Sequence, residues 1–126
     1  MNRYAKFLIP IFFLFFFGGV FAQNCAILKN SSFSYKMGGQ KVLVEFKGNE
    51  YTEYHQEKKY YIKSKIEWIS DCEYNLVIQE VNLPDFPFEK NNTLHVTITK
   101  VKGNRVYYSS SIGGRTWEGK MKKIEK

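Results

Sequence analysis

The stretch KYYIKSKIEWI, residues 59–69, decides the fold class of this chain. Its side chains alternate between two kinds, with the two-residue repeat of a β-strand. One face carries Tyr60, Ile62, Ser64, Ile66 and Trp68. The other face carries Tyr61, Lys63, Lys65 and Glu67. The pattern predicts a strand with one side in an apolar core and the other side in water.

Similar short segments precede and follow this strand, and turn residues separate them. Gly38-Gly39, Gly48-Asn49, residues 102–104 and Gly113-Gly114 favour tight turns, because glycine and asparagine tolerate positive φ. Between the turns we expect eight strands. The fifth begins at Cys72, and the other seven lie at residues 32–37, 40–47, 50–57, 59–69, 93–101, 105–112 and 115–124.

The segment from Leu83 to Asn92 breaks the alternation. Pro84 and Pro87 cannot donate backbone hydrogen bonds to a sheet, so we predict a loop that carries Phe86 and Phe88. No amphipathic helix is expected. The fold class is therefore all-β, an antiparallel meander that forms a small barrel or a strongly bent sheet, because closure removes exposed strand edges.

The first 22 residues have the pattern of a signal peptide. Arg3 and Lys6 precede an uncharged run from Phe7 to Val20, and small Ala22 suits a cleavage site. The run is shorter than the roughly twenty residues that span a bilayer, so we favour cleavage over a permanent anchor. Lipidation of Cys25 fits less well, because two other residues separate it from the cleavage site.

Residues 23–126 then form a single domain in the periplasm or outside the cell, with no transmembrane span. Loss of Arg3 and Lys6 lowers the formal net charge from +7 to +5. The lysines are dispersed among glutamates, which predicts a solvated surface and no specific binding of nucleic acid. Loose attraction to an anionic membrane or polysaccharide stays open.

Cys25 and Cys72 are the two cysteines of the chain. In an oxidising compartment an even pair predicts a disulfide, and two buried free thiols are the alternative. Without clustered histidines the pair cannot complete a four-ligand site, so no metal is expected.

Two stretches resemble a family of small exported proteins of Bacteroidota, especially flavobacteria. They are NCAILK (24–29), followed by FSY (33–35), and IEWISDCEYNL (66–76), with the family's Trp-x-x-Asp-Cys-x-Tyr-x-Leu segment. Asn30-Ser31-Ser32 stands where the family often has glycine, and Lys47 where arginine is common. The resemblance implies a lipocalin-like β-meander outside the cytoplasm. It implies no established activity, and hence no catalytic residue.

The residues themselves show no catalytic constellation and no cofactor motif, so we expect no enzyme. His55 and His95 are interpreted as surface strand histidines. Glu50, Glu53 and Glu57 are expected on solvated faces.

Aromatic residues provide the remaining functional hypothesis. A small apolar ligand or a cell-envelope partner is expected, and a ligand site would be formed by Tyr60, Ile62, Ile66, Trp68, Tyr74 and Tyr108. The alternative is a structural or interaction module whose core these side chains fill. Four further tyrosines are expected to point outward and to suit a contact surface: Tyr51, Tyr54, Tyr61 and Tyr107.

Overall fold

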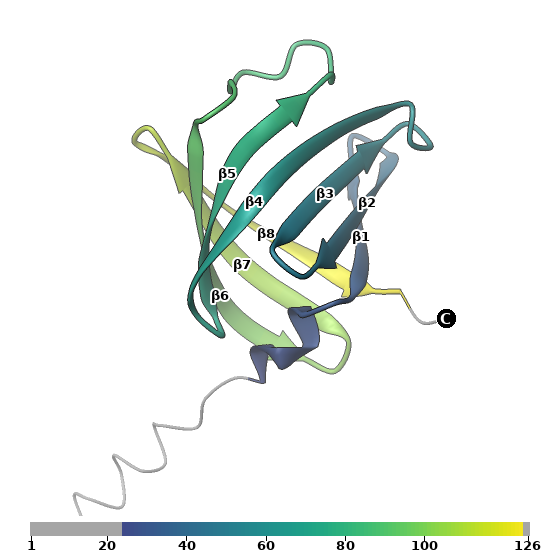
Figure 1. The fold of residues 1–126 in the computed structure, drawn as a ribbon. Helices are drawn as coiled ribbons and strands as arrows, with labels where there is room; N and C mark the ends of the chain where they lie inside the picture. Colours follow the sequence, from purple (N-terminus) through teal and green to yellow (C-terminus); the bar gives the residue numbers. More distant parts are fainter. Residues whose placement is uncertain (1–23, 125–126) are drawn as a thin grey trace, which may run out of the picture.

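A computed structural model describes residues 24–124 as a closed eight-stranded barrel (Figure 1). One turn of 3-10 helix, η1 (Cys25–Leu28), precedes the strands. The strands are β1 (Ser32–Met37), β2 (Gln40–Lys47), β3 (Glu50–His55), β4 (Tyr60–Ser70), β5 (Glu73–Val81), β6 (Thr93–Lys102), β7 (Arg105–Ile112) and β8 (Arg115–Lys123). Each strand pairs antiparallel with the next, and β8 pairs with β1. The predicted all-β meander is confirmed, and of the two geometries expected it adopts the barrel.

The predicted strand boundaries agree with the observed ones to within a few residues, and the differences lie at turns. β3 ends at His55 because Gln56, Glu57 and Lys58 all adopt positive φ and turn the chain toward β4. Cys72 lies in the turn between β4 and β5 and does not begin the strand.

Bulges let the sheet curl far enough to close. The pairing register shifts twice between β4 and β5, at Lys63/Ser64 and at Trp68/Ser70, and once in β6, at Ile98/Lys100. An extra residue on one strand of a pair bends that strand and increases the local twist, which a small barrel needs.

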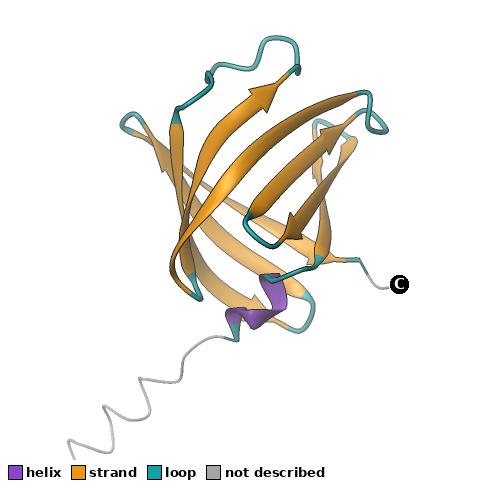
Figure 2. Ribbon diagram, in the orientation of Figure 1, coloured by secondary structure: helices purple, strands orange, loops and turns teal. Residues whose placement is uncertain are grey.

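The two ends of the barrel differ. η1 lies under one end, and the loop between β5 and β6 rises above the other (Figure 2). At the η1 end the core is filled by aromatic rings around Phe46, whose centroid lies 5.2–6.5 Å from those of Phe33, Tyr51, Trp68 and Tyr74. Leu28 of η1 is fully buried in the same cluster. This end therefore has a packed apolar floor.

The predicted disulfide between Cys25 and Cys72 is present, with 5.3 Å between the Cα atoms. It ties η1 to the turn between β4 and β5. The Lys29 ammonium lies 3.2 Å from the Asp71 carboxylate beside it and 5.2 Å from the centroid of the Trp68 ring. The start of the described chain is thus held against the floor by covalent, ionic and aromatic contacts.

No helix within residues 24–124 combines the length and the hydropathy that crossing a bilayer would require. The predicted signal peptide lies outside the described residues.

We expect Cys25→Ser and Cys72→Ser each to lower the free energy of unfolding by about 2–4 kcal/mol, because the disulfide constrains the unfolded chain. The two residues are 47 positions apart, so loss of the bond increases the conformational freedom of a long loop in the unfolded chain. Denaturant unfolding of the oxidised proteins measures the loss. The double variant should cost no more than either single variant, since one bond is removed in all three. Additive losses would contradict this account.

Candidate functional site

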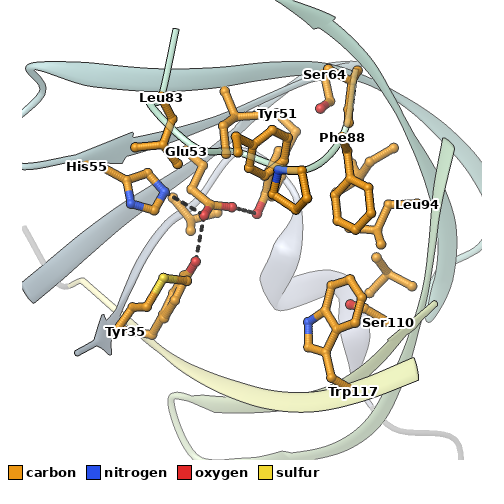
Figure 3. A pocket seen from close by; sticks show the side chains of 18 of the residues that line it. Tyr35, Tyr51, Glu53, His55, Ser64, Leu83, Phe88, Leu94, Ser110 and Trp117 are labelled. Atoms are coloured by element: carbon orange, nitrogen blue, oxygen red, sulfur yellow. Dashed lines mark hydrogen bonds and ion pairs between the residues drawn. The ribbon is translucent and has the colours of Figure 1, made fainter. Parts of the chain in front are cut away.

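A cavity of about 540 Å³ occupies the half of the barrel opposite η1. This volume lies within the range of sites that hold small molecules. Figure 3 shows its lining: mainly apolar and aromatic side chains, with a polar cluster on one side. The apolar wall comes from four different strands and includes Val44, Ile62, Leu76 and Leu94.

The polar cluster centres on the carboxylate of Glu53 in β3. The hydroxyl of Tyr35 donates to Oε1 of Glu53 at 2.6 Å, and the hydroxyl of Tyr51 donates to Oε2 at 2.8 Å. Nε2 of His55 lies 2.8 Å from Oε1. The side chains of Glu53 and His55 are only 15% and 9% exposed. Three hydrogen-bonding groups therefore converge on one largely buried carboxylate (Figure 3).

The expectation that Glu53 and His55 lie on solvated faces is wrong, and so is the outward orientation of Tyr51. The tight turn at Gly48-Asn49 sets the pairing of β2 with β3, so that Val44 lies opposite Glu53. Because side chains alternate along a strand, Glu53 shares the inner face with its neighbours at 51 and 55.

The signal for this correction was present in the sequence. Counting back from the Gly48-Asn49 turn places Phe46 opposite Tyr51 and Val44 opposite Glu53. The charge of Glu53 favours a solvated face, whereas this register places its side chain on the inner face. A carboxylate on an inward face is an exception that needs hydrogen-bond partners, and here the partners come from two strands.

Burial disfavours ionisation of the cavity's phenols. It raises the pKa of Tyr35, Tyr51 and Tyr74 well above the usual value, and the negative charge of Glu53 adds to the effect for Tyr35 and Tyr51. Burial, followed by the Glu53 charge, raises the pKa of Tyr108 to about 12. At neutral pH these four residues present hydroxyl groups that can donate hydrogen bonds.

Aromatic side chains from one loop and one strand cover the mouth of the cavity. Phe88 in the β5–β6 loop stacks on Trp117 of β8, with ring centroids 6.4 Å apart and planes 6° from parallel. Phe86 meets Phe88 edge to face at 5.5 Å. The apolar loop predicted from the sequence thus forms part of the cavity lining. Trp117 remains 39% exposed, so the cover can be reached from outside.

One wall depends on a glycine. Tyr108 of β7 pairs with Gly119 of β8, and a Cβ at position 119 would lie 2.6 Å from the Tyr108 ring. Only glycine leaves room for the ring against this strand. A second hollow opens on the other side, between β1 and β8, and Tyr35 and Tyr108 line both spaces.

The predicted ligand-binding residues are divided between the two halves of the barrel. Ile62 and Tyr108 line the cavity, and so does Tyr74, whose ring also packs against Phe46 in the floor. Ile66 is buried in the packed floor, and Trp68 packs against that floor. Tyr60 does not line the cavity; it pairs with His55 at the rim, under the ammonium group of Lys59. Sequence reasoning did not select Tyr35, Glu53, His55, Ser64, Ser110 or Trp117, which the structure places in the lining.

The outer face carries a second histidine–glutamate pair. Nε2 of His95 lies 2.6 Å from Oε2 of Glu73, and the side chains are 41% and 38% exposed. His95 is therefore a surface strand histidine, as predicted. Tyr54, Tyr61 and Tyr107 lie under the ammonium groups of Lys58, Lys63 and Lys100.

Within residues 24–124 no cluster of three or more His, Cys, Asp or Glu side chains is arranged to hold a metal ion. Comparison with family models, with curated proteins and with solved structures gave no match.

Alkaline pH should destabilise the domain through Tyr35, Tyr51, Tyr74 and Tyr108. An unfolded tyrosine ionises near pH 10.0, whereas the folded pKa values are higher, so the folded state holds more protons above that pH. Their contribution to stability is complete below about pH 10 and falls as the pH rises further. Phenolate absorbance of these four should appear together with the loss of the circular dichroism signal. Tyr74→Phe should reduce the phenolate absorbance that appears as the circular dichroism signal is lost. Smooth ionisation of all four in a folded barrel would contradict the burial.

Proposed function

We propose that the domain binds a small ligand with a mainly apolar body and one polar group, the polar group lying at the Glu53 cluster. One observation carries this proposal: a cavity of about 540 Å³ above a packed floor, with convergent polar groups on one wall. Eight-stranded barrels have an interior that side chains can fill or that can hold one small ligand.

The alternative, a module with a filled core, fits only the η1 end of this barrel. There Phe46 and its aromatic neighbours leave little space. In the half that contains the cavity, the inward positions of Ser64 in β4 and Ser110 in β7 carry small side chains. Small residues at inward positions leave unfilled volume, which supports binding over a purely structural role.

Binding is proposed in place of catalysis. Glu53 is hydrogen-bonded to His55 and to two tyrosine hydroxyls, and no serine hydroxyl within the described residues is hydrogen-bonded to His55. The arrangement thus lacks the nucleophile–base contact of a covalent mechanism.

We also propose that the domain acts after export, as the resemblance to exported Bacteroidota proteins implies. The disulfide supports this location, because such bonds persist in oxidising compartments. The pattern of the first 22 residues supports it independently.

Ligand binding is tested with the neutral apolar fluorophore N-phenyl-1-naphthylamine. The oxidised protein should enhance its fluorescence with one saturable site. Ser110→Phe should weaken binding by about tenfold or more, since the new ring occupies the cavity. Ser109→Phe adds the same ring to the outer face of the same strand and should leave binding unchanged. Circular dichroism verifies that both variants fold. Absence of saturable binding, or equal effects of the two variants, would refute the proposal.

Export predicts a defined N-terminus. Cleavage after Ala22 should produce a mature chain that begins at Gln23, because the small residue at the end of the apolar run suits the peptidase. Intact-mass measurement of the protein from envelope and secreted fractions decides this. A mature pool that retains Met1 or the apolar run would contradict it.

A further inference from the structure

The charged groups that line the cavity are opposite in sign to the protein as a whole. Without Arg3 and Lys6 of the predicted signal peptide the formal net charge is still +5, yet the cavity lining contains two carboxyl groups, Glu53 and Asp85, and no lysine or arginine. We propose that the cavity selects ligands whose polar group is an amine, protonated to an ammonium ion, on an apolar or aromatic body. This inference rests on the ligand-binding function proposed above and adds the chemical class of the ligand.

Glu53 is arranged as an acceptor. Two phenolic O–H groups and one imidazole nitrogen point at its carboxylate, and a carboxylate has about four acceptor positions. One position therefore remains for a donor from the ligand. An ammonium group offers three donors and a positive charge, so it complements the carboxylate in both respects.

An anionic group would meet the opposite situation. The donors at this wall, Tyr35, Tyr51 and His55, are already directed at Glu53. A ligand carboxylate would have to draw them away from Glu53 and would face another negative charge in a space lined mainly by apolar side chains. Like charges placed together at a desolvated contact disfavour binding, which supports discrimination against acids.

The aromatic lining favours the same ligand class. Figure 3 places Trp117 and Phe88 across the cavity from the Glu53 cluster. Ring faces attract cations and also pack against apolar groups. On the outer surface, lysine ammonium groups already lie 5.0 Å from the ring centroids of Tyr54 and Tyr61. Inside, the aromatic rings are available to the ligand.

The positive exterior does not oppose this selection strongly. At physiological ionic strength, charges on the surface are screened beyond about 8 Å, whereas a partly buried pair is screened much less. The lysines therefore affect the approach of a ligand only weakly. The charge that the bound ligand meets at short range is that of Glu53.

The test compares decylamine, 1-decanol and decanoate, which share a chain length and differ in the polar group. Each competes with N-phenyl-1-naphthylamine at neutral pH, physiological salt and concentrations below micelle formation. Decylamine should displace the fluorophore at about tenfold lower concentration than decanoate, with decanol between them. Non-specific attraction to the basic surface would produce the reverse order. Equal or tighter binding of decanoate would overturn the inference.

Two matched variants locate the selectivity. Glu53→Gln should reduce the difference between amine and acid to about threefold or less, because it removes the charge and keeps the size. Glu73→Gln removes a glutamate that is also paired with a histidine, but outside the barrel, and should leave the difference unchanged. An undiminished preference in a folded Glu53→Gln variant would overturn the assignment.

The order of the three ligands on the unmodified protein decides the inference even where Glu53→Gln does not fold. If the fluorophore does not bind at all, the proposed function fails as well. If the fluorophore binds and the amine has no advantage, only the ligand class is wrong.

Discussion

The barrel encloses an interior because β8 pairs with β1, and the ladder between these two strands is short. Two registered pairs join the strands, Phe33 with Lys123 and Ser34 with Lys122, and the Ile124 N–H adds a bond to the Ser32 carbonyl at 2.8 Å. Every other neighbouring pair of strands has a longer ladder. The pairing ends at Ser34 while β1 continues to Met37, and the hollow between the two strands opens beyond it.

The two ends of the barrel divide stability and binding between them. At the floor, the disulfide, η1 and the aromatic rings around Phe46 exclude water and bury apolar surface. At the mouth, small inward residues leave a cavity whose lining lacks the packing contacts of a filled core. A well-packed half can support a hollow half, because the covalent bond and the apolar contacts of the floor hold the strands in place.

The buried carboxylate gives the cavity its chemical character. A charge inside a protein is costly unless it is paired or hydrogen-bonded, and Glu53 meets that condition through Tyr35, Tyr51 and His55. The tyrosines belong to β1 and β3, which are separated by β2, so the cluster depends on the curvature of the closed sheet. The same groups then set the polarity that a ligand meets at this wall.

The sequence by itself determined the strands, their order and the pairing of the cysteines. Alternation in residues 59–69 and glycine turns such as Gly48-Asn49 are local signals, and local signals specify a meander of neighbouring strands. The two cysteines allow only one intramolecular bond. The inward position of Glu53 could also have been obtained by counting from the Gly48-Asn49 turn, although its charge argued against it.

Only the tertiary structure decided that the sheet closes, which half of its interior is filled and which side chains meet across it. Closure depends on contacts between the first and last strands, which are far apart in the sequence. The volume of the cavity depends on how large and small side chains from several strands combine in its lining, which includes both Ser64 and Ser110 and the rings of Tyr108 and Trp117. Alternation assigns a residue to the inner face but not to a height along the barrel axis. It therefore could not separate Trp68 and Ile66 in the floor from Ile62 and Tyr108 in the cavity lining.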